Sequence, residues 1–158
     1  MNDLSELIPT INAIARYGQQ PTLPESANVK DLERYLVKIY SLYFEISYEF
    51  DGIQYPDFDR ESLPDLRENI CRNFPDFGLY KTSIDPTNFD NLDDFGVGDA
   101  IDDLADIIKD LLEIKWRIEN NSIADGLWYF ENLFNGHTKE HVVDLLKYIG
   151  ELEYKNNQ

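Results

Sequence analysis

The stretch Asp99-Ala-Ile-Asp-Asp-Leu-Ala-Asp-Ile-Ile-Lys-Asp-Leu-Leu-Glu113 separates acidic and aliphatic side chains at helical spacing. Aspartates spaced four, three and four residues apart lie along one side of a helix: Asp99, Asp103, Asp106 and Asp110. A core-facing stripe lies on another side, formed by Ile101, Leu104, Ala105, Ile108 and Leu112. Like charges at this spacing repel each other, so the aspartates indicate either a solvated surface or a site for a positively charged group.

Periodicity and capping signals elsewhere predict an all-α, single-domain bundle of about six helices spanning residues 1–158. We expect helices at about 4–17, 29–48, 62–73, 98–120, 123–134 and 138–153. Asn28, Ser62 and Ser122 are the expected N-caps of the second, third and fifth of these, and Asn135-Gly136 is expected to end the fifth. The second helix is the most apolar and is expected at the centre of the bundle. The long connection 74–95 carries five aromatic residues, which we expect to pack across the bundle.

The acidic composition of the chain limits the kinds of partner that the protein can bind. The chain has 158 residues, 31 acidic against 14 basic side chains and a net charge of −17. Such a charge argues against binding to nucleic acid or to an anionic membrane, because both need cationic groups. It suits a basic protein partner or a metal cation, and the simpler alternative is an acidic surface that keeps the protein in solution.

The single cysteine, Cys71, lies between apolar positions and is expected to be a small core residue. One thiol cannot form a disulfide within the chain and fits a reducing compartment. The N-terminal residues lack the features of a signal peptide, and no apolar run reaches the roughly 18–20 residues needed to span a bilayer. We therefore expect a cytoplasmic protein.

No catalytic signature is present: the chain has no Gly-rich phosphate loop, no G-x-S-x-G motif and no H-E-x-x-H motif. The sequence therefore favours a protein without enzymatic activity and leaves catalysis open.

The only histidines, His137 and His141, stand four residues apart. At this spacing on a helix both imidazoles can face one cation, and Asp144 could add a carboxylate. A mixed set of histidine and carboxylate ligands would suit zinc, manganese or iron. Two alternatives to a metal site remain open. One of the histidines can simply hydrogen-bond to an aspartate of the helix 98–120, which would raise the pKa of that histidine, or the histidines can contact a partner. Gly136 can also leave His137 outside the helix, which would remove the alignment.

The C-terminal half resembles the DUF5063 family of uncharacterised bacterial proteins. The resemblance runs through Asp85-Pro86, residues 98–112, Gly126-Leu-Trp-Tyr-Phe-Glu-Asn-Leu-Phe-Asn-Gly-His137 and His141-Val-Val-Asp-Leu-Leu146. Residues at the positions of the family pattern are Asp102, Asp103, Asp106, Asp110, Trp128, His137 and His141. Thr138 and Lys139 replace the Trp-Gly that is usual in the family. The resemblance implies a shared fold and a bacterial origin, and it implies no function.

Three hypotheses of function follow. The first is a non-catalytic, acidic interaction module that binds, and by doing so neutralises or sequesters, a basic protein partner through Asp99, Asp103, Asp106 and Asp110, without a cofactor. The second is a protein that binds or depends on a divalent metal such as zinc or manganese through His137, His141 and Asp144, together with the acidic stripe. The third is a small-molecule pocket lined by the aromatic helix 29–48 and Trp128. The sequence does not predict the oligomeric state.

Overall fold

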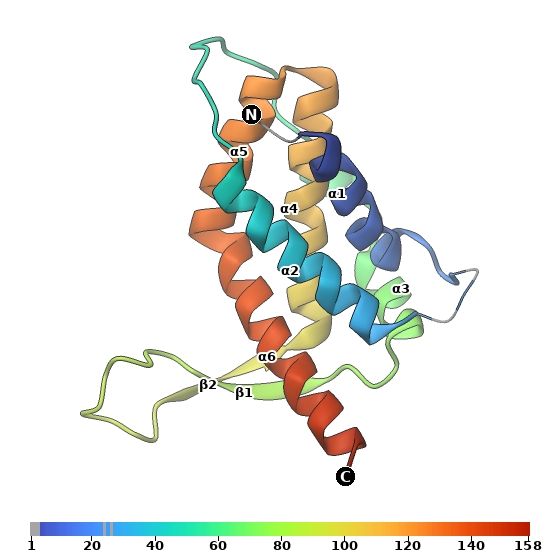
Figure 1. Cartoon of the computed structure of the whole chain (residues 1–158), viewed down its shortest axis with the longest axis vertical. Helices are drawn as coiled ribbons and strands as arrows, with labels where there is room; N and C mark the ends of the chain where they lie inside the picture. The colour runs from blue at the N-terminus through green and yellow to red at the C-terminus, as the bar shows by residue number, and fades with distance from the viewer. Residues whose placement is uncertain (1–3, 24, 26) are drawn as a thin grey trace.

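The computed structural model describes residues 4–23, 25 and 27–158, and it shows a helical bundle from which one β-hairpin extends (Figure 1). The prediction of an all-α bundle is therefore confirmed for the bundle itself, and the two-stranded sheet is the departure from it. In the part of the chain that the structure describes, no helix has both the length and the apolar character needed to cross a membrane.

Helix α4 (Ala100–Asn120) is the centre of the bundle. It contacts α1 (Leu4–Gln19), α3 (Leu66–Asn73), α5 (Ile123–Leu133) and α6 (Lys139–Asn156). Asp99 caps its N-terminus, where the side chain accepts a hydrogen bond from the Ile101 amide at 2.9 Å. The aliphatic stripe predicted from the sequence faces the core. Its members Leu104, Ala105, Ile108 and Leu112 are buried, and Ile101 is partly buried.

The prediction that the second helix is central is wrong. Helix α2 (Val29–Glu45) packs against α1 and α6 and buries only one row of side chains, formed by Leu32, Leu36, Ile39 and Leu42. Asn28 caps it as predicted, by accepting a hydrogen bond from the Lys30 amide. Several of its aromatic rings only partly enter the core, and Phe44 remains 70% exposed, so an apolar circumference does not by itself place a helix at the centre.

Helices α5 and α6 form one continuous rod, because a single π-helical turn, Phe134–Thr138, joins them. The Lys139 amide donates to the Phe134 carbonyl, five residues back. The prediction that Asn135-Gly136 ends the helix is wrong, since Gly136 does not adopt the left-handed conformation that ends helices. Among the described residues only Gly52 has a positive φ, of 69°.

The segment 46–65 is an extended strap that crosses α4 and carries the short 3₁₀ turn Arg60–Ser62. Helix α3 begins at Leu66 with Asp65 as its N-cap, so the prediction of Ser62 as the cap is wrong. Pro64 explains the difference, because a residue before proline avoids the helical region, and Leu63 has a ψ of 137°.

Strands β1 (Leu79–Ser83) and β2 (Phe95–Asp99) pair antiparallel, with Leu79 opposite Asp99 and Ser83 opposite Phe95. The expectation that the connection 74–95 packs across the bundle holds at its base, where Phe74 and Phe77 are buried. It is wrong for the tip, because Phe89 is 78% exposed and Figure 1 shows the hairpin projecting away from the helices.

Cys71 is exposed on α3, which corrects the prediction of a core cysteine. Leu66 and Ile70 are the buried residues of this short helix. Cys71 directly follows Ile70, and consecutive residues on a helix point about 100° apart, so the cysteine faces away from the core.

Candidate metal centre

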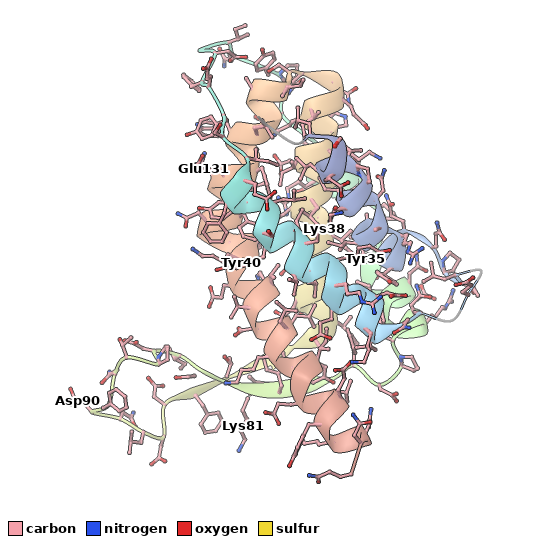
Figure 2. The ribbon with its side chains drawn as sticks, viewed as in Figure 1. Tyr35, Lys38, Tyr40, Lys81, Asp90 and Glu131 are labelled. Atoms are coloured by element: carbon pink, nitrogen blue, oxygen red, sulfur yellow. The ribbon has the colours of Figure 1, made fainter. Side chains whose placement is uncertain are left out.

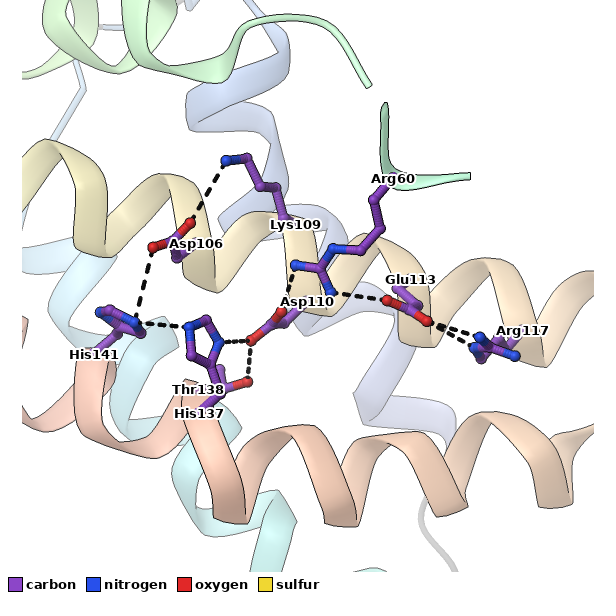
Figure 3. A network of polar contacts seen from close by, with 9 residues as sticks. All are labelled: Arg60, Asp106, Lys109, Asp110, Glu113, Arg117, His137, Thr138 and His141. Atoms are coloured by element: carbon purple, nitrogen blue, oxygen red, sulfur yellow. Dashed lines mark hydrogen bonds and ion pairs between the residues drawn. The ribbon is translucent and has the colours of Figure 1, made fainter. Parts of the chain in front are cut away.

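The two histidines face each other at the junction of the π turn and α6. His137 belongs to the π turn, His141 lies on the first turn of α6, and their Nε2 atoms are 3.1 Å apart (Figure 3). The i,i+4 alignment predicted from the sequence is therefore present, because the helix continues through Gly136.

Each histidine is held from behind by a carboxylate of α4. His137 Nδ1 lies 2.7 Å from Asp110 Oδ2, and His141 Nδ1 lies 2.8 Å from Asp103 Oδ1. A carboxylate only accepts hydrogen bonds, so both Nδ1 atoms carry the proton and donate. In a neutral imidazole this leaves the Nε2 atom with a free lone pair.

Two lone pairs that face each other at 3.1 Å repel unless a positive species lies between or beside them. A shared proton is one such species, and a metal ion is another. Two imidazole nitrogens bound to one metal lie roughly 2.9–3.3 Å apart, depending on the bond angle, when the metal–nitrogen bonds are about 2.0–2.1 Å long. The observed separation falls within this range.

Asp106 places a carboxylate oxygen near the two histidines, where it could act as a third metal ligand. Its Oδ2 atom lies 3.8 Å from His141 Nε2, and one ligand atom from each of Asp106, His137 and His141 lies within 4.8 Å of the others. Lys109 also pairs with Asp106, at 3.5 Å. The His137 side chain is 47% exposed, so the cluster is open to solvent, whereas the supporting carboxylate of Asp110 is 1% exposed.

The carboxylates behind the histidines are themselves held by other elements. Arg60, from the strap, donates to Asp110 Oδ1 at 2.7 Å, and buried Thr138 donates to Asp110 Oδ2 at 2.7 Å. Tyr80, from β1, donates its hydroxyl proton to the second oxygen of Asp103. Burial and the Asp103 carboxylate both raise the pKa of Tyr80, so this hydroxyl stays protonated and remains a donor.

The network continues along α4. Arg60 also donates to Glu113 at 2.8 Å, and Glu113 accepts two hydrogen bonds from the buried Arg117, at 2.8 and 3.0 Å. Figure 3 shows this chain of contacts running from Asp106 to Arg117 along one side of the helix. The strap is therefore bound to the same row of acidic residues that holds the histidines.

Asp103 raises the pKa of His141 through its hydrogen bond, against the opposing effect of burial. The Asp103 carboxylate therefore favours a positive charge at this ring. A proton or a metal cation can supply that charge.

Two acidic residues predicted for a site lie elsewhere. Asp144 accepts a long hydrogen bond from Thr82, at 3.5 Å, and lies outside the group formed by Asp106, His137 and His141. Asp99 caps α4 and pairs with Arg67 at 3.1 Å. Asp144 therefore lies apart from the three side chains that could hold a metal ion, and Asp106 is the member of the predicted acidic stripe that lies beside the histidines.

The aspartates of α4 do not form one exposed acidic surface. Asp103 and Asp110 are 6% and 0% exposed, and both already bind partners within the chain. Their burial removes them from any open surface, although the predicted alignment of the aspartates along α4 is present. Asp106 is partly exposed and remains accessible.

Three supporting residues were missed in the sequence: Arg60, Tyr80 and Thr138. Arg60 and Tyr80 reach the site from segments 50 and 23 positions away from their carboxylate partners. Periodicity along one helix carries no information about such contacts. For Thr138, next to His137, the sequence indicates only the start of the last helix and a departure from the DUF5063 pattern.

The predicted aromatic pocket is only partly present. Trp128 lines a cavity of about 230 Å³, together with Phe50, Tyr129 and Arg117. Helix α2 contributes nothing to it, since its Tyr40 and Tyr43 rings pack against Phe134 instead.

Comparison with protein-family models, with curated proteins and with solved structures finds no match for this chain. The resemblance to DUF5063 stays a prediction from the sequence.

Proposed function

We propose that this protein binds a divalent transition-metal ion through His137 Nε2, His141 Nε2 and a carboxylate oxygen of Asp106. The observation that carries the proposal is the 3.1 Å approach of two Nε2 atoms whose Nδ1 atoms both bind carboxylates. Such carboxylate–histidine pairs orient the ring and raise its basicity in metal sites.

The donor set defines the class of metal. Imidazole and carboxylate together suit zinc, manganese and iron(II), whereas calcium and magnesium prefer oxygen ligands alone. By the general order of divalent affinities, zinc should bind more tightly than manganese. Three protein ligands leave further positions open, and a metal with an open position supplies an acidified water.

Thermal unfolding of metal-stripped protein, with and without zinc, manganese or calcium, tests the proposal. Metal at about 100 times its Kd stabilises by about 2.7 kcal/mol, which raises the Tm by roughly 5–10 °C for a domain of this size. We expect this rise with zinc, a smaller rise with manganese and none specific to calcium.

The double substitution His137→Ala/His141→Ala should abolish the zinc-dependent rise. Glu140→Gln is the matched control, because Glu140 is an exposed carboxylate next to His141 and lies outside the cluster. An equal rise in the double variant would mean that zinc only screens the acidic surface, and the proposal would be wrong.

An acidic interaction module that binds a basic partner remains a second proposal, and the net charge of −17 is what supports it. The exposed carboxylates outside the cluster would form such a surface, because Asp103 and Asp110 are buried. Binding to a basic partner should then weaken steeply as salt rises, and binding that does not change with salt would contradict it. A cytoplasmic location and a bacterial origin also stay predictions from the sequence.

A further inference from the structure

The groove between β1 and α6 has the construction of a ligand site, and we propose that it binds a small organic anion. This inference goes beyond the metal centre and does not depend on it. The groove encloses about 440 Å³, within the range of small-molecule sites. Its walls come from two elements, β1, which contributes Tyr80, Lys81 and Thr82, and α6, which contributes Lys147, Tyr148 and Lys155.

The floor of the groove is apolar and fixed in place. Tyr80 and Tyr148 lie against each other with ring centroids 5.4 Å apart. The Tyr148 hydroxyl donates to the Asp76 carbonyl at 3.1 Å and accepts from the Gly78 amide at 3.0 Å. These bonds hold the base of the hairpin against α6, so the groove is formed before any ligand binds.

The rim carries positive charge. Lys81, Lys147 and Lys155 are exposed, and within residues 4–23, 25 and 27–158 none of them forms an ion pair with a carboxylate. Of the five other lysines, four pair with a carboxylate, Lys30, Lys38, Lys109 and Lys115, whereas Lys139 donates a hydrogen bond to Asn135. In a chain with 31 acidic and 14 basic residues, three unpaired lysines at one cavity are a local reversal of charge.

Two acidic residues also line the groove, and they leave a positive excess. Asp144, which accepts a hydrogen bond from Thr82, and Glu151 contribute two negative charges, against three positive charges from the lysines, so the groove carries an excess of one positive charge. An apolar floor with a cationic rim fits a ligand that has a hydrocarbon or aromatic body and one carboxylate, sulfonate or phosphate group.

Lys81 lies where the hairpin passes α6 (Figure 2), and its ammonium group is 5.0 Å from the centre of the Phe95 ring. Phe95 belongs to β2 and does not line the groove, so Lys81 lies at the hairpin edge of the groove. Lys147 and Lys155 supply the charge on the helix side, so an anionic group within the groove has cations on both sides.

The test uses the dye 8-anilinonaphthalene-1-sulfonate as the probe, with a chelator present so that no metal contributes. We expect a single saturable site in the wild type. Lys147→Gln/Lys155→Gln should raise the Kd of the dye by about tenfold or more, because the variant removes two positive charges beside the sulfonate group. Thr82→Trp, which fills the groove and keeps every lysine, should also abolish binding.

Lys115→Gln/Lys139→Gln is the matched control, because it removes the same charge from lysines outside the groove. Its dye affinity should equal that of the wild type. The proposal is overturned if both lysine pairs lower the affinity equally, if the uncharged analogue N-phenyl-1-naphthylamine binds as tightly as the dye, or if the wild type shows no saturable site. None of these dye-binding measurements depends on whether zinc binds His137 and His141.

Discussion

At the scale of single residues, the central feature is a pair of histidines that α4 holds from behind. Asp103 and Asp110 fix the two Nδ1 atoms, so the two Nε2 atoms point at each other and toward Asp106. The spacing of His137 and His141 predicts that they share one face of a helix. Their carboxylate partners are 27 and 38 positions away and could be assigned only from the fold.

Asp103→Asn tests whether the carboxylate behind His141 tunes the metal centre. The amide oxygen can still accept the Nδ1 hydrogen bond, but the negative charge that favours a cation is lost. We expect zinc affinity, measured by isothermal titration calorimetry, to fall by about 10–100-fold. An unchanged zinc affinity would show that Asp103 orients His141 without strengthening metal binding. The control variant Glu140→Gln should have the zinc affinity of the wild type.

Asp144→Asn should make the protein more stable at neutral pH. Burial raises the pKa of Asp144, so its charged form is less favourable in the folded state than in the unfolded state. Asparagine removes this cost and still accepts the hydrogen bond from Thr82. The advantage should shrink as pH falls through the folded-state pKa of Asp144 and disappear below its unfolded value of about 3.9.

Urea denaturation of both proteins at a series of pH values measures this difference. Thr87→Ala is a suitable control, because it alters the neighbourhood of another carboxylate, Asp85, on the projecting hairpin loop. An advantage of the Asp144→Asn protein that grows as the pH falls would contradict the assignment.

At the scale of elements, the helices follow the aliphatic periodicity, and the departures have local causes. Pro64 delays the start of α3 to Leu66, and Gly136 keeps a helical conformation so that α5 and α6 join. The π turn that joins them contains His137. Single π turns within α-helices are frequent at functional sites, which agrees with the position of the proposed metal centre.

The close packing of α5 on α4 depends on Gly126. A Cβ atom at this position would lie 2.2 Å from Ile118 Cγ1 and 2.9 Å from the Ile118 backbone nitrogen. Gly126→Ala should therefore push the helices apart and cost about 1–3 kcal/mol in the free energy of unfolding.

Gly150→Ala is the matched control in α6, because a Cβ there meets no atom within 4 Å. It should raise the free energy of unfolding by about 0.5–1 kcal/mol, since alanine favours a helix over glycine. Chemical denaturation of both variants gives the comparison. Equal effects at the two positions would mean that the α4–α5 contact is not as close as described.

At the scale of the whole molecule, a central acidic helix organises a bundle that has one projecting hairpin (Figure 1). A net charge of −17 suggests a surface crowded with carboxylates, yet Asp103, Asp110 and Glu113 are buried on α4. Each of them binds a histidine, an arginine or a hydroxyl from another element. Part of the negative charge of this protein therefore belongs to its internal polar network.

The hairpin loop should be dispensable for folding. Phe89 and Leu92 are 78% and 82% exposed, so residues 84–94 add little to the core. Replacing 84–94 by Asn-Gly should leave the free energy of unfolding within about 0.5 kcal/mol, because a short turn joins the paired strands at low entropic cost. Zinc binding should be retained. A large loss of stability would indicate that the loop packs against the bundle in solution.

The sequence supports the prediction of a helical bundle, of the caps Asn28 and Ser122, and of a shared face for His137 and His141. It does not predict the hairpin, whose strands are five residues each and contain Gly96 and Gly98. Gly98 allows the Tyr80 ring to lie across it, since a Cβ there would be 2.2 Å from that ring. Such cross-strand contacts depend on register, which one sequence does not provide.

X-ray absorption spectroscopy at the zinc edge, on protein loaded with one equivalent of zinc, tests the central claim most directly. The proposed centre predicts one retained zinc per chain, with scattering from two imidazoles at about 2.0–2.1 Å and from oxygen ligands. Zinc that washes off the protein, or a shell of oxygen ligands without imidazole scattering, would contradict it. The histidine pair would then be held together by a shared proton alone.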